Sequence, residues 1–296
     1  MTTPITSCIN EPEFADVYPP SEDSYLFLDA LESDGAFLSK LSPGVTLEVG
    51  SGSGVISAFL CSCISKPLFH ICTDISPAAC RASLRVLNLN VPNSSVAYDV
   101  INCSLATSLL PRLHGKVDLI MFNPPYVPTS FEEHQSAGST LVASWSGGLL
   151  GRQVIDQFLD QTVNLLSSQG CIYLLLSEDN RPDEVHRIMM KLSNGKLKAK
   201  PILRRRSQNE FLTVFRRINT SLHCSPFCTA SSLFNMLAFN FMLLAISSPY
   251  KFGNSYPGKK DKVKQVCQKI INHPAQHVEA QEAKKAAEEL MKQLRK

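Results

Sequence analysis

The tetrapeptide Asn123-Pro124-Pro125-Tyr126 contains the residues of this chain whose types and order are best suited to chemistry. A planar amide or exocyclic amine nitrogen attacks carbon poorly, because conjugation ties up its lone pair. An Asn oxygen and the next carbonyl can hold the N–H groups of such a nitrogen. Two prolines fix φ near about −65° and remove competing donors, and the aromatic ring can pack on a flat group. The pattern predicts a site that alkylates a flat NH₂ group, with a strand-ending turn as the alternative.

A glycine-rich turn lies upstream, between a predicted strand and a predicted helix. Val45–Val49 is typical of a short buried strand, Gly50, Gly52 and Gly54 follow, and an apolar helix is expected from Val55. Glycines let the main chain approach a ligand, and the N–H groups at a helix start suit a carboxylate or phosphate. The GxGxG spacing alone is weak, since glycine turns also serve as plain connectors.

An acid closes the next predicted strand. The apolar run 68–73 ends at Asp74, about twenty residues after Gly54, where dinucleotide-type folds place the acid that binds two ribose hydroxyls. Glu48 stands before the glycines and Asn123 ends a later strand. Taken together, these positions predict a nucleoside-containing cofactor at the carboxyl ends of neighbouring strands.

Strands and helices alternate from Val45 onward, which predicts an α/β fold with a mostly parallel sheet covered on both faces. Helices are expected at 77–89, 154–166 and 184–192, and further strands at 117–122, 171–176 and 210–215. The polar segment 131–146 is interpreted as a mobile loop over the active site, with a passive connector as the alternative.

Three motifs, Glu48–Gly54, Thr73-Asp74-Ile75 and Asn123–Tyr126, make the chain resemble the class I methyltransferases that use S-adenosylmethionine. Four further segments narrow the resemblance to the eukaryotic HemK/PrmC-type glutamine methyltransferase of the class 1 translation release factor: Tyr18–Ser24, Leu110–Leu113, Ser144–Gly148 and Gly151-Arg152. The resemblance covers about residues 14–217. It implies a Rossmann-like, seven-stranded sheet with an antiparallel C-terminal strand.

The resemblance also implies roles at matching positions. The implied cofactor-binding residues are Ser24, Glu48, Gly50, Gly52, Gly54, Asp74 and Asn123. Among these, Glu48 and Gly50 would line the methionine and ribose part, Asp74 would bind the ribose diol, and Ser24 would lie near the cofactor carboxylate. The implied catalytic residues are Asn123, which orients the substrate amide, Pro124, which lends its carbonyl, and Tyr126.

The adenine side of the implied cofactor site has two candidates. The family carries an acid after its third strand, and Asp99 fits that pattern. The run 100–108 is longer than expected, however, and a shifted register would put Ser104 there and leave no acid. Asp99 is the prediction and Ser104 the alternative.

The implied activity is N5-methylation of a glutamine side-chain amide, in the GGQ loop of the class 1 release factor. The enzymatic alternatives are methylation of adenine or guanine amines of DNA or RNA, or of a histone lysine, since the tetrapeptide also serves nucleobase methyltransferases. The non-enzymatic alternative is an inactive scaffold of the same fold, which the set of Glu48, Asp74 and Asn123 disfavours.

The charge distribution disfavours long nucleic acid as a partner. Residues 218–296 contain 11 Lys and Arg against 5 Asp and Glu, a net charge of +6, so residues 1–217 carry −3 of the total +3. Binding to duplex nucleic acid usually needs several cationic phosphate contacts. The ten cysteines form no CxxC pairs and the start of the chain lacks a signal-peptide pattern. A reducing compartment follows, the cytosol, with the nucleus as the alternative.

Composition divides the chain into a methyltransferase domain, 1–217, and a C-terminal extension, 218–296. An apolar helix is expected at 233–246; it is too short for comfortable membrane insertion, so a buried or interfacial helix is predicted. A charged helix is expected at about 275–296. His223, Cys224 and Cys228 offer a weak metal-site alternative, and no metal is predicted.

Arg204-Arg205-Arg206 is expected to be a solvated loop, with a contact to acidic substrate or RNA as the alternative. Trp145 is expected in the core, with shielding of the cofactor as the alternative. The resemblance further implies a heterodimer with a small zinc-binding activator subunit that covers an apolar surface and adds strands to the sheet edge.

Overall fold

The computed structural model describes residues 2–64, 68–91, 96–130, 141–207 and 210–219, together with seven single positions between 268 and 292. Contacts group the chain into two units, Met1–His223 and Cys224–Lys296, and the first contains the sheet. Within the described ranges, no helix combines the length and apolar character that crossing a membrane requires.

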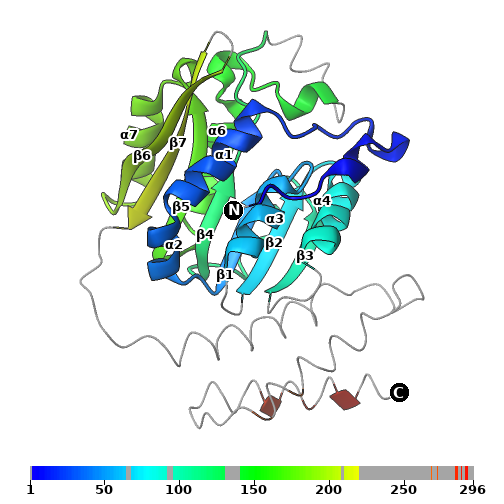
Figure 1. Ribbon diagram of the computed structural model, residues 1–296. Helices are drawn as coiled ribbons and strands as arrows, with labels where there is room; N and C mark the ends of the chain where they lie inside the picture. Colours follow the sequence, from blue (N-terminus) through cyan, green and yellow to red (C-terminus); the bar gives the residue numbers. More distant parts are fainter. Residues whose placement is uncertain are drawn as a thin grey trace. The chain divides into compact units, whose positions relative to one another are not determined.

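The first unit is built on a seven-stranded sheet (Figure 1). Its strands are β1 (Val45–Val49), β2 (Leu68–Asp74), β3 (Val96–Asn102), β4 (Val117–Phe122), β5 (Leu166–Ser177), β6 (Leu197–Ser207) and β7 (Glu210–Asn219). The order is β3-β2-β1-β4-β5-β7-β6. Strands β1 to β5 are parallel, whereas β7 is antiparallel to β5 and to β6. The predicted Rossmann-like methyltransferase fold is confirmed.

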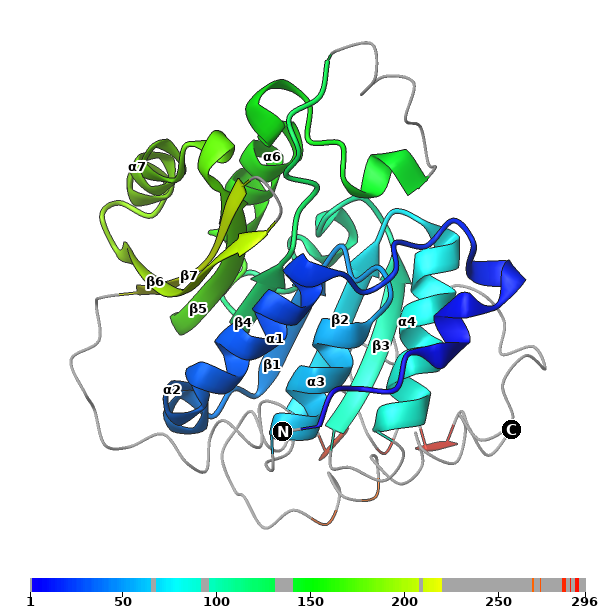
Figure 2. The same cartoon turned by 45° about the horizontal axis from the view of Figure 1, so that its top comes forward.

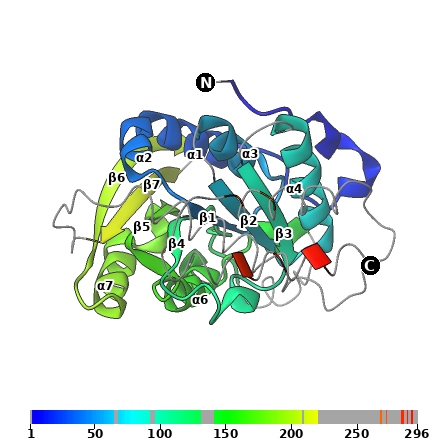
Figure 3. The same cartoon turned by 90° about the horizontal axis from the view of Figure 1, so that it is seen from below.

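Helices cover both faces of this sheet, as the view from below shows (Figure 3). One face carries α1 (Glu22–Ser33), α2 (Gly35–Leu41), α3 (Val55–Cys63) and α4 (Pro77–Asn90). The other carries α6 (Gln153–Thr162) and α7 (Pro182–Leu192). Two short 3-10 helices, η1 (Ser7–Asn10) and η2 (Pro12–Phe14), run beside α4 (Figure 2).

The central strands are apolar along their whole length because both of their faces are covered. Leu47 on β1, Ile120 on β4 and Leu174 on β5 are fully buried, which is the usual pattern of a parallel sheet between two helical layers. The exceptions are four buried polar side chains on β1 and β2, namely Thr46, Glu48, His70 and Thr73. Burying a polar group is costly unless it is hydrogen-bonded, and Thr46, Glu48 and His70 are.

Two element predictions are wrong in detail. The helix expected at 154–166 ends at Thr162, because β5 begins already at Leu166 and the chain must turn between them. Arg204-Arg205-Arg206 belongs to β6, not to a loop. There Arg204 pairs with Glu178 and Arg205 lies 2.6 Å from Asp29, so half-exposed ion pairs replace free solvation.

Most predictions for the C-terminal extension lie outside the described residues. This holds for the apolar helix 233–246, for His223, Cys224 and Cys228, and for most of the charged helix 275–296. Within that last range the described positions are all helical: Lys284, Lys285, Glu288, Met291 and Lys292.

Candidate active site

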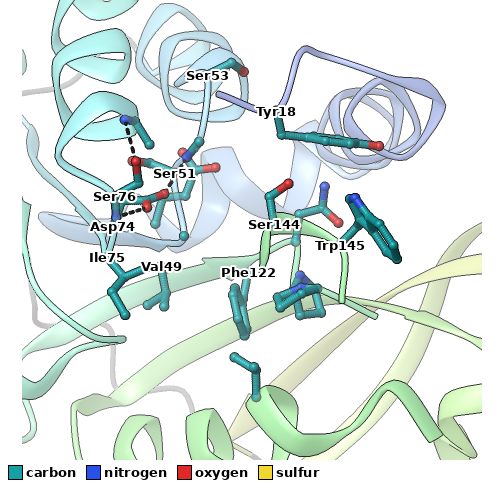
Figure 4. A pocket seen from close by; sticks show the side chains of 18 of the residues that line it. Tyr18, Val49, Ser51, Ser53, Asp74, Ile75, Ser76, Phe122, Ser144 and Trp145 are labelled. Atoms are coloured by element: carbon teal, nitrogen blue, oxygen red, sulfur yellow. Dashed lines mark hydrogen bonds between the residues drawn. The ribbon is translucent and has the colours of Figure 1, made fainter. Parts of the chain in front are cut away.

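A cavity of about 560 Å³ opens at the carboxyl ends of β1, β2 and β4. The strand order reverses between β1 and β4, and ligands of open α/β sheets bind at such a switch point. The volume suits a small molecule. Asp74 lies at one end of the cavity, and Tyr18 and Trp145 lie at the other (Figure 4).

The charges around this cavity are all of one sign. Four acidic side chains line it, namely Asp16, Asp23, Glu48 and Asp74, and no Lys, Arg or His is among its described lining residues. Phosphate groups are normally bound by cations or by backbone N–H groups. The lining therefore favours a cationic nucleoside, such as the sulfonium S-adenosylmethionine, over a dinucleotide with its pyrophosphate.

The glycine turn presents main chain to the cavity. Gly50 and Gly52 line it and have φ values of +63° and +51°, which side chains rarely adopt. Gly54 does not line it, so its predicted cofactor contact is not supported. A Cβ on Gly54 would lie 2.6 Å from the Cα of Ser83, so this glycine instead lets α3 start close against α4.

Asp74 is held by the same turn. Its Oδ2 accepts from the Gly52 N–H at 2.9 Å and its Oδ1 from the Ser76 N–H at 2.8 Å. Burial raises the pKa of Asp74, and these N–H groups partly oppose that effect. The carboxyl group is thereby fixed at the edge of the cavity with lone pairs left for a diol, which fits the predicted role.

Glu48 lines the cavity from β1 and is only 1% exposed. Burial, opposed by hydrogen bonds from Ser57, raises its pKa to about 8. Ser24, at the start of α1, also lines the cavity. Its hydroxyl accepts from the Ser21 N–H at 3.3 Å as part of a capping box. Both residues thus line the cavity, and the cofactor contacts expected of them stay predictions.

The adenine-side prediction is corrected by the cavity. Asp99 is not among its lining residues, whereas Ser104 and Leu105 are. Asp99 pairs with Ile71 in the middle of β3, and only residues beyond the carboxyl end of that strand reach the cavity. Because β3 continues to Asn102, the residue that reaches the cavity is Ser104, and no acid stands at the adenine-side position.

Asn123 is oriented by a residue one hundred positions earlier in the chain. Its Nδ2 donates to Asp23 Oδ2 at 2.9 Å, and Asp23 is itself buried at the start of α1. A carboxyl oxygen selects the NH₂ side of the amide, so Oδ1 must point elsewhere. That Oδ1 is buried and has no hydrogen-bond partner within the described structure.

The backbone that follows Asn123 is held in place by hydrogen bonds and by close packing. Asn180, fully buried, donates through Nδ2 to the carbonyl of Tyr126 at 2.8 Å and to that of Leu150 at 3.0 Å. Gly147 and Gly151 pack directly on this stretch, because a Cβ on either would overlap the carbonyl of Pro125 or of Tyr126. The predicted Ser-Trp-Ser-Gly-Gly segment thus supports the tetrapeptide.

Side chains of the tetrapeptide and the indole of Trp145 line the cavity. Pro124 and Tyr126 both line it, and burial raises the pKa of Tyr126, which stays protonated. Trp145 also lines it and is 36% exposed, so the core position predicted for it is wrong. Of the predicted loop 131–146, residues 131–140 lie outside the described residues, and Leu141–Ser144 form the 3-10 helix η4.

Two contributors to the site escaped the sequence analysis as individual residues. Asp23 stands inside the family-like segment Tyr18–Ser24, in the first turn of α1, and membership of that segment was the available signal. Asn180 follows β5 in a short 3-10 helix, η6 (Glu178–Asn180), with no local motif. Only the fold brings it within 2.8 Å of Tyr126.

The chain is similar to methyltransferases of known kind. It is 42% identical to Methyltransferase HEMK2 of Mus musculus over 214 residues, 72% of this chain and 95% of that protein. It is 37% identical to the eRF1 methyltransferase catalytic subunit mtq2 of Schizosaccharomyces pombe over 223 residues, 73% of this chain and 95% of that protein.

Among solved structures, the Mtq2–Trm112 complex of E. cuniculi, described as responsible for methylation of the eRF1 termination factor, is 27% identical. It covers 69% of this chain and 99% of that chain, with a TM-score of 0.48. No protein-family model matches the sequence. The acid-lined cavity, the glycine turn with Asp74 and the two curated relatives agree: the chain belongs to the HEMK2/Mtq2 family of S-adenosylmethionine-dependent methyltransferases.

Proposed function

We propose that this enzyme methylates the side-chain amide nitrogen of a glutamine in the GGQ loop of the class 1 translation release factor. The observation that carries the proposal is the buried Oδ1 of Asn123, an acceptor without a partner in the described structure. A buried acceptor left unpaired costs about 1–3 kcal/mol. A substrate N–H group that fills the position recovers this free energy.

The residues of this chain bind and orient the substrate and the cofactor, and they exclude water. S-adenosylmethionine, when bound, supplies the methyl group and the leaving sulfur. Asp23 turns Asn123 so that its oxygen accepts one N–H of the substrate amide, and the carbonyl of Pro124 is proposed to accept the other. With both hydrogens held, the amide nitrogen keeps its lone pair directed at the methyl carbon. The proton is lost to water as the new bond forms, so no histidine base is required.

The charges of the site favour this substrate over a nucleobase within a nucleic acid. A nucleobase arrives with phosphates, and the described lining of the cavity offers carboxyl groups but no cation. In the nearby basic run of β6, Arg204 and Arg205 are engaged by Glu178 and Asp29. Phosphate binding there would have to displace these acids.

Tandem mass spectrometry of the release factor, incubated with the enzyme, its partner and labelled cofactor, tests the proposal. We expect one added methyl group, on the glutamine of the GGQ loop. A release factor with that glutamine replaced by glutamate, which lacks the NH₂ group, is the matched control and should stay unlabelled. Label on DNA, RNA or histone lysine, with none on the release factor, would overturn the assignment.

We further propose that the active form is a heterodimer with a small zinc-binding subunit at the β3 edge of the sheet. The name of the fission-yeast relative describes a catalytic subunit. Strands β3 and β6 are the two edges of the sheet. Residues 97–101 of β3 are half-buried and carry one charge, whereas β6 bears five cationic side chains: Lys198, Lys200, Arg204, Arg205 and Arg206. An edge with one charge suits strand addition better than an edge with five.

Co-expression tests the partner. We expect higher soluble yield and a single complex on size-exclusion chromatography when both chains are made together. Ile101→Lys, which places a charge on the β3 edge, should reduce complex formation. Arg206→Ala, on the opposite edge, is the control and should leave it unchanged. A fully active monomer, or loss of the complex only in the Arg206 variant, would contradict this placement.

A further inference from the structure

A chain of hydrogen bonds runs from Glu48 into the protein core, away from the cavity. Thr46 and Glu48 lie two residues apart on β1, directly beside His70 and Cys72 on β2. Because side chains alternate along a strand, all four lie on one face of the sheet. The helix α3 places Ser57 among them. All five residues are at most 1% exposed.

The distances define a continuous path. The Ser57 hydroxyl donates to Glu48 Oε2. His70 Nε2 lies 2.6 Å from Ser57 Oγ, and His70 Nδ1 lies 2.7 Å from Thr46 Oγ1. Burial lowers the pKa of His70 to about 3, so the imidazole is neutral and carries one ring proton. One of its nitrogens therefore donates while the other accepts.

The direction of each bond constrains the direction of the next, since each group has at most one proton to give. Cys72 Sγ, 3.0 Å from Ser57 Oγ and 3.4 Å from His70 Nε2, is a weaker additional partner of both. When Glu48 is ionised, Ser57 must donate to it. His70 then donates from Nε2 to Ser57 and accepts at Nδ1 from Thr46. When Glu48 carries a proton on Oε2, it donates to Ser57, Ser57 donates to His70 Nε2, and Nδ1–H donates to Thr46. The two states differ in every bond.

We propose that His70 is a positioning residue: its Nε2–H tautomer holds the Ser57 hydroxyl on ionised Glu48, and the chain reverses when Glu48 takes up a proton. In the step to the ionised state, one proton leaves Glu48 for the solvent of the cavity. Over the same step the imidazole takes up one proton from solvent at Nε2 and releases one to solvent from Nδ1. The net change is therefore the single proton lost by Glu48, and the imidazole stays neutral. The inference rests on the proposed function only in taking Glu48 as the acid that faces a cationic ligand.

The other groups that face Glu48 do not account for this reversal of hydrogen bonds. Two thiols face Glu48: Cys61 from α3 and Cys72 from β2. Burial raises the pKa of both thiols, so both stay neutral. Asp74, also on β2, raises the pKa of Glu48 by its charge. From β4 the paired residue is Met121, which does not titrate. Burial raises the pKa of Glu48 to about 8, so the reversal falls within a pH range that can be measured on the folded protein.

Nitrogen NMR of the complete wild-type protein, labelled on its histidines, tests the proposal without a variant. We expect the Nδ1–H tautomer of His70 at pH 6 and the Nε2–H tautomer above pH about 8. At pH 7, S-adenosylmethionine should favour Nε2–H more than S-adenosylhomocysteine, which lacks the positive charge. His114, which is exposed, is the reference. A single tautomer at every pH, with and without either ligand, would overturn the proposal.

Two variants of His70 sharpen the test. His70→Phe removes the donor to Ser57 and should weaken S-adenosylmethionine binding roughly tenfold at pH 7 by calorimetry, since a hydrogen bond that serves a charged group is at stake. His70→Gln, whose amide can donate to Ser57, should retain most of the affinity. Equal affinity in wild type and both variants would contradict the positioning role. Glu48→Gln should abolish the pH dependence of the His70 tautomer, and its persistence would also count against it.

The outcome is separable from that of the proposed function. An enzyme that methylates the release factor but keeps one His70 tautomer would refute the hydrogen-bond reversal alone. An enzyme that shows the reversal but leaves the release factor unmodified would refute the substrate assignment alone.

Discussion

The two halves of the cavity are built differently. The cofactor half comes from neighbouring strand ends, where the Gly52 N–H donates to Asp74 Oδ2 and Gly50 lines the same cavity. The substrate half is assembled from distant parts of the chain, since Asn123 depends on Asp23 and Tyr126 depends on Asn180. Local geometry thus forms the first half. Tertiary packing forms the second, which we expect to be more sensitive to single substitutions at a distance.

The strongest test of this comparison removes the acceptor itself. Asn123→Ala should lower kcat by about 100-fold or more, the range for loss of one preorganised polar group in an active site. Because Asn123 belongs to the substrate half, S-adenosylmethionine affinity measured by calorimetry should change little. Near-normal turnover in this variant would show that the orienting role is wrong.

Asp23→Ala removes the partner of the Asn123 amide without touching the acceptor. We expect kcat to fall roughly tenfold to 100-fold, because the amide can then rotate and offer NH₂ where oxygen is needed. Asp23→Asn is the conservative comparison: its side-chain oxygen can still accept from Asn123 and should preserve much of the rate. Steady-state kinetics of both variants separate orientation from charge. Equal loss in the two would argue for an electrostatic role of Asp23.

Asn180→Ala probes the clamp behind the tetrapeptide. The carbonyls of Tyr126 and Leu150 and the N–H of Ser177 would lose their partner. Such buried groups cost about 1–3 kcal/mol each when unsatisfied, so we expect the free energy of unfolding to fall by about 2–4 kcal/mol. Denaturant titration measures it. Asn164→Ala, an exposed position in the turn between α6 and β5, is the control. A stable Asn180 variant would mean that the clamp is dispensable.

Glu48→Gln tests the buried acid of the cofactor half. The pKa of Glu48 rises from 4.5 unfolded to about 8 folded, so its stabilising contribution is present below pH 4.5 and lost as pH rises through 8. For His70 the pKa falls from 6.5 to about 3, so that contribution is lost as pH falls below 6.5. The two trends oppose each other between pH 4.5 and 6.5.

Between pH 6.5 and 8 only the loss from Glu48 remains. The ligand-free wild type should lose about 2 kcal/mol of unfolding free energy over this interval, and Glu48→Gln should not. Thermal or denaturant unfolding at both pH values checks the difference. An equal loss of unfolding free energy in both proteins would show that Glu48 does not titrate between pH 6.5 and 8.

The sequence predicted the part of the cofactor half that is local, namely Glu48, Gly50, Gly52 and Asp74, all of which line the cavity. Glu48, the glycine turn and Asp74 follow one another along β1 and β2, so spacing alone determines their arrangement. The motif predicted Asn123. It did not predict Asp23 as the partner of Asn123 or Asn180 as the partner of Tyr126, because nothing near Asp23 or Asn180 in the sequence signals a contact made by tertiary packing. Asp99 was misplaced because the length of β3, which decides which residue passes the strand end, depends on its pairing with β2.

The cationic side chains on β6 have a consequence for the behaviour of the protein in concentrated solution. An open sheet edge is a template on which another copy can add a strand, and such addition leads to insoluble fibres. This eleven-residue strand carries five cationic side chains. Arg204 and Arg205 are in ion pairs, and the remaining positive charge repels the same strand of a neighbouring molecule. This edge is therefore expected to resist self-association even while the rest of the sheet is forming.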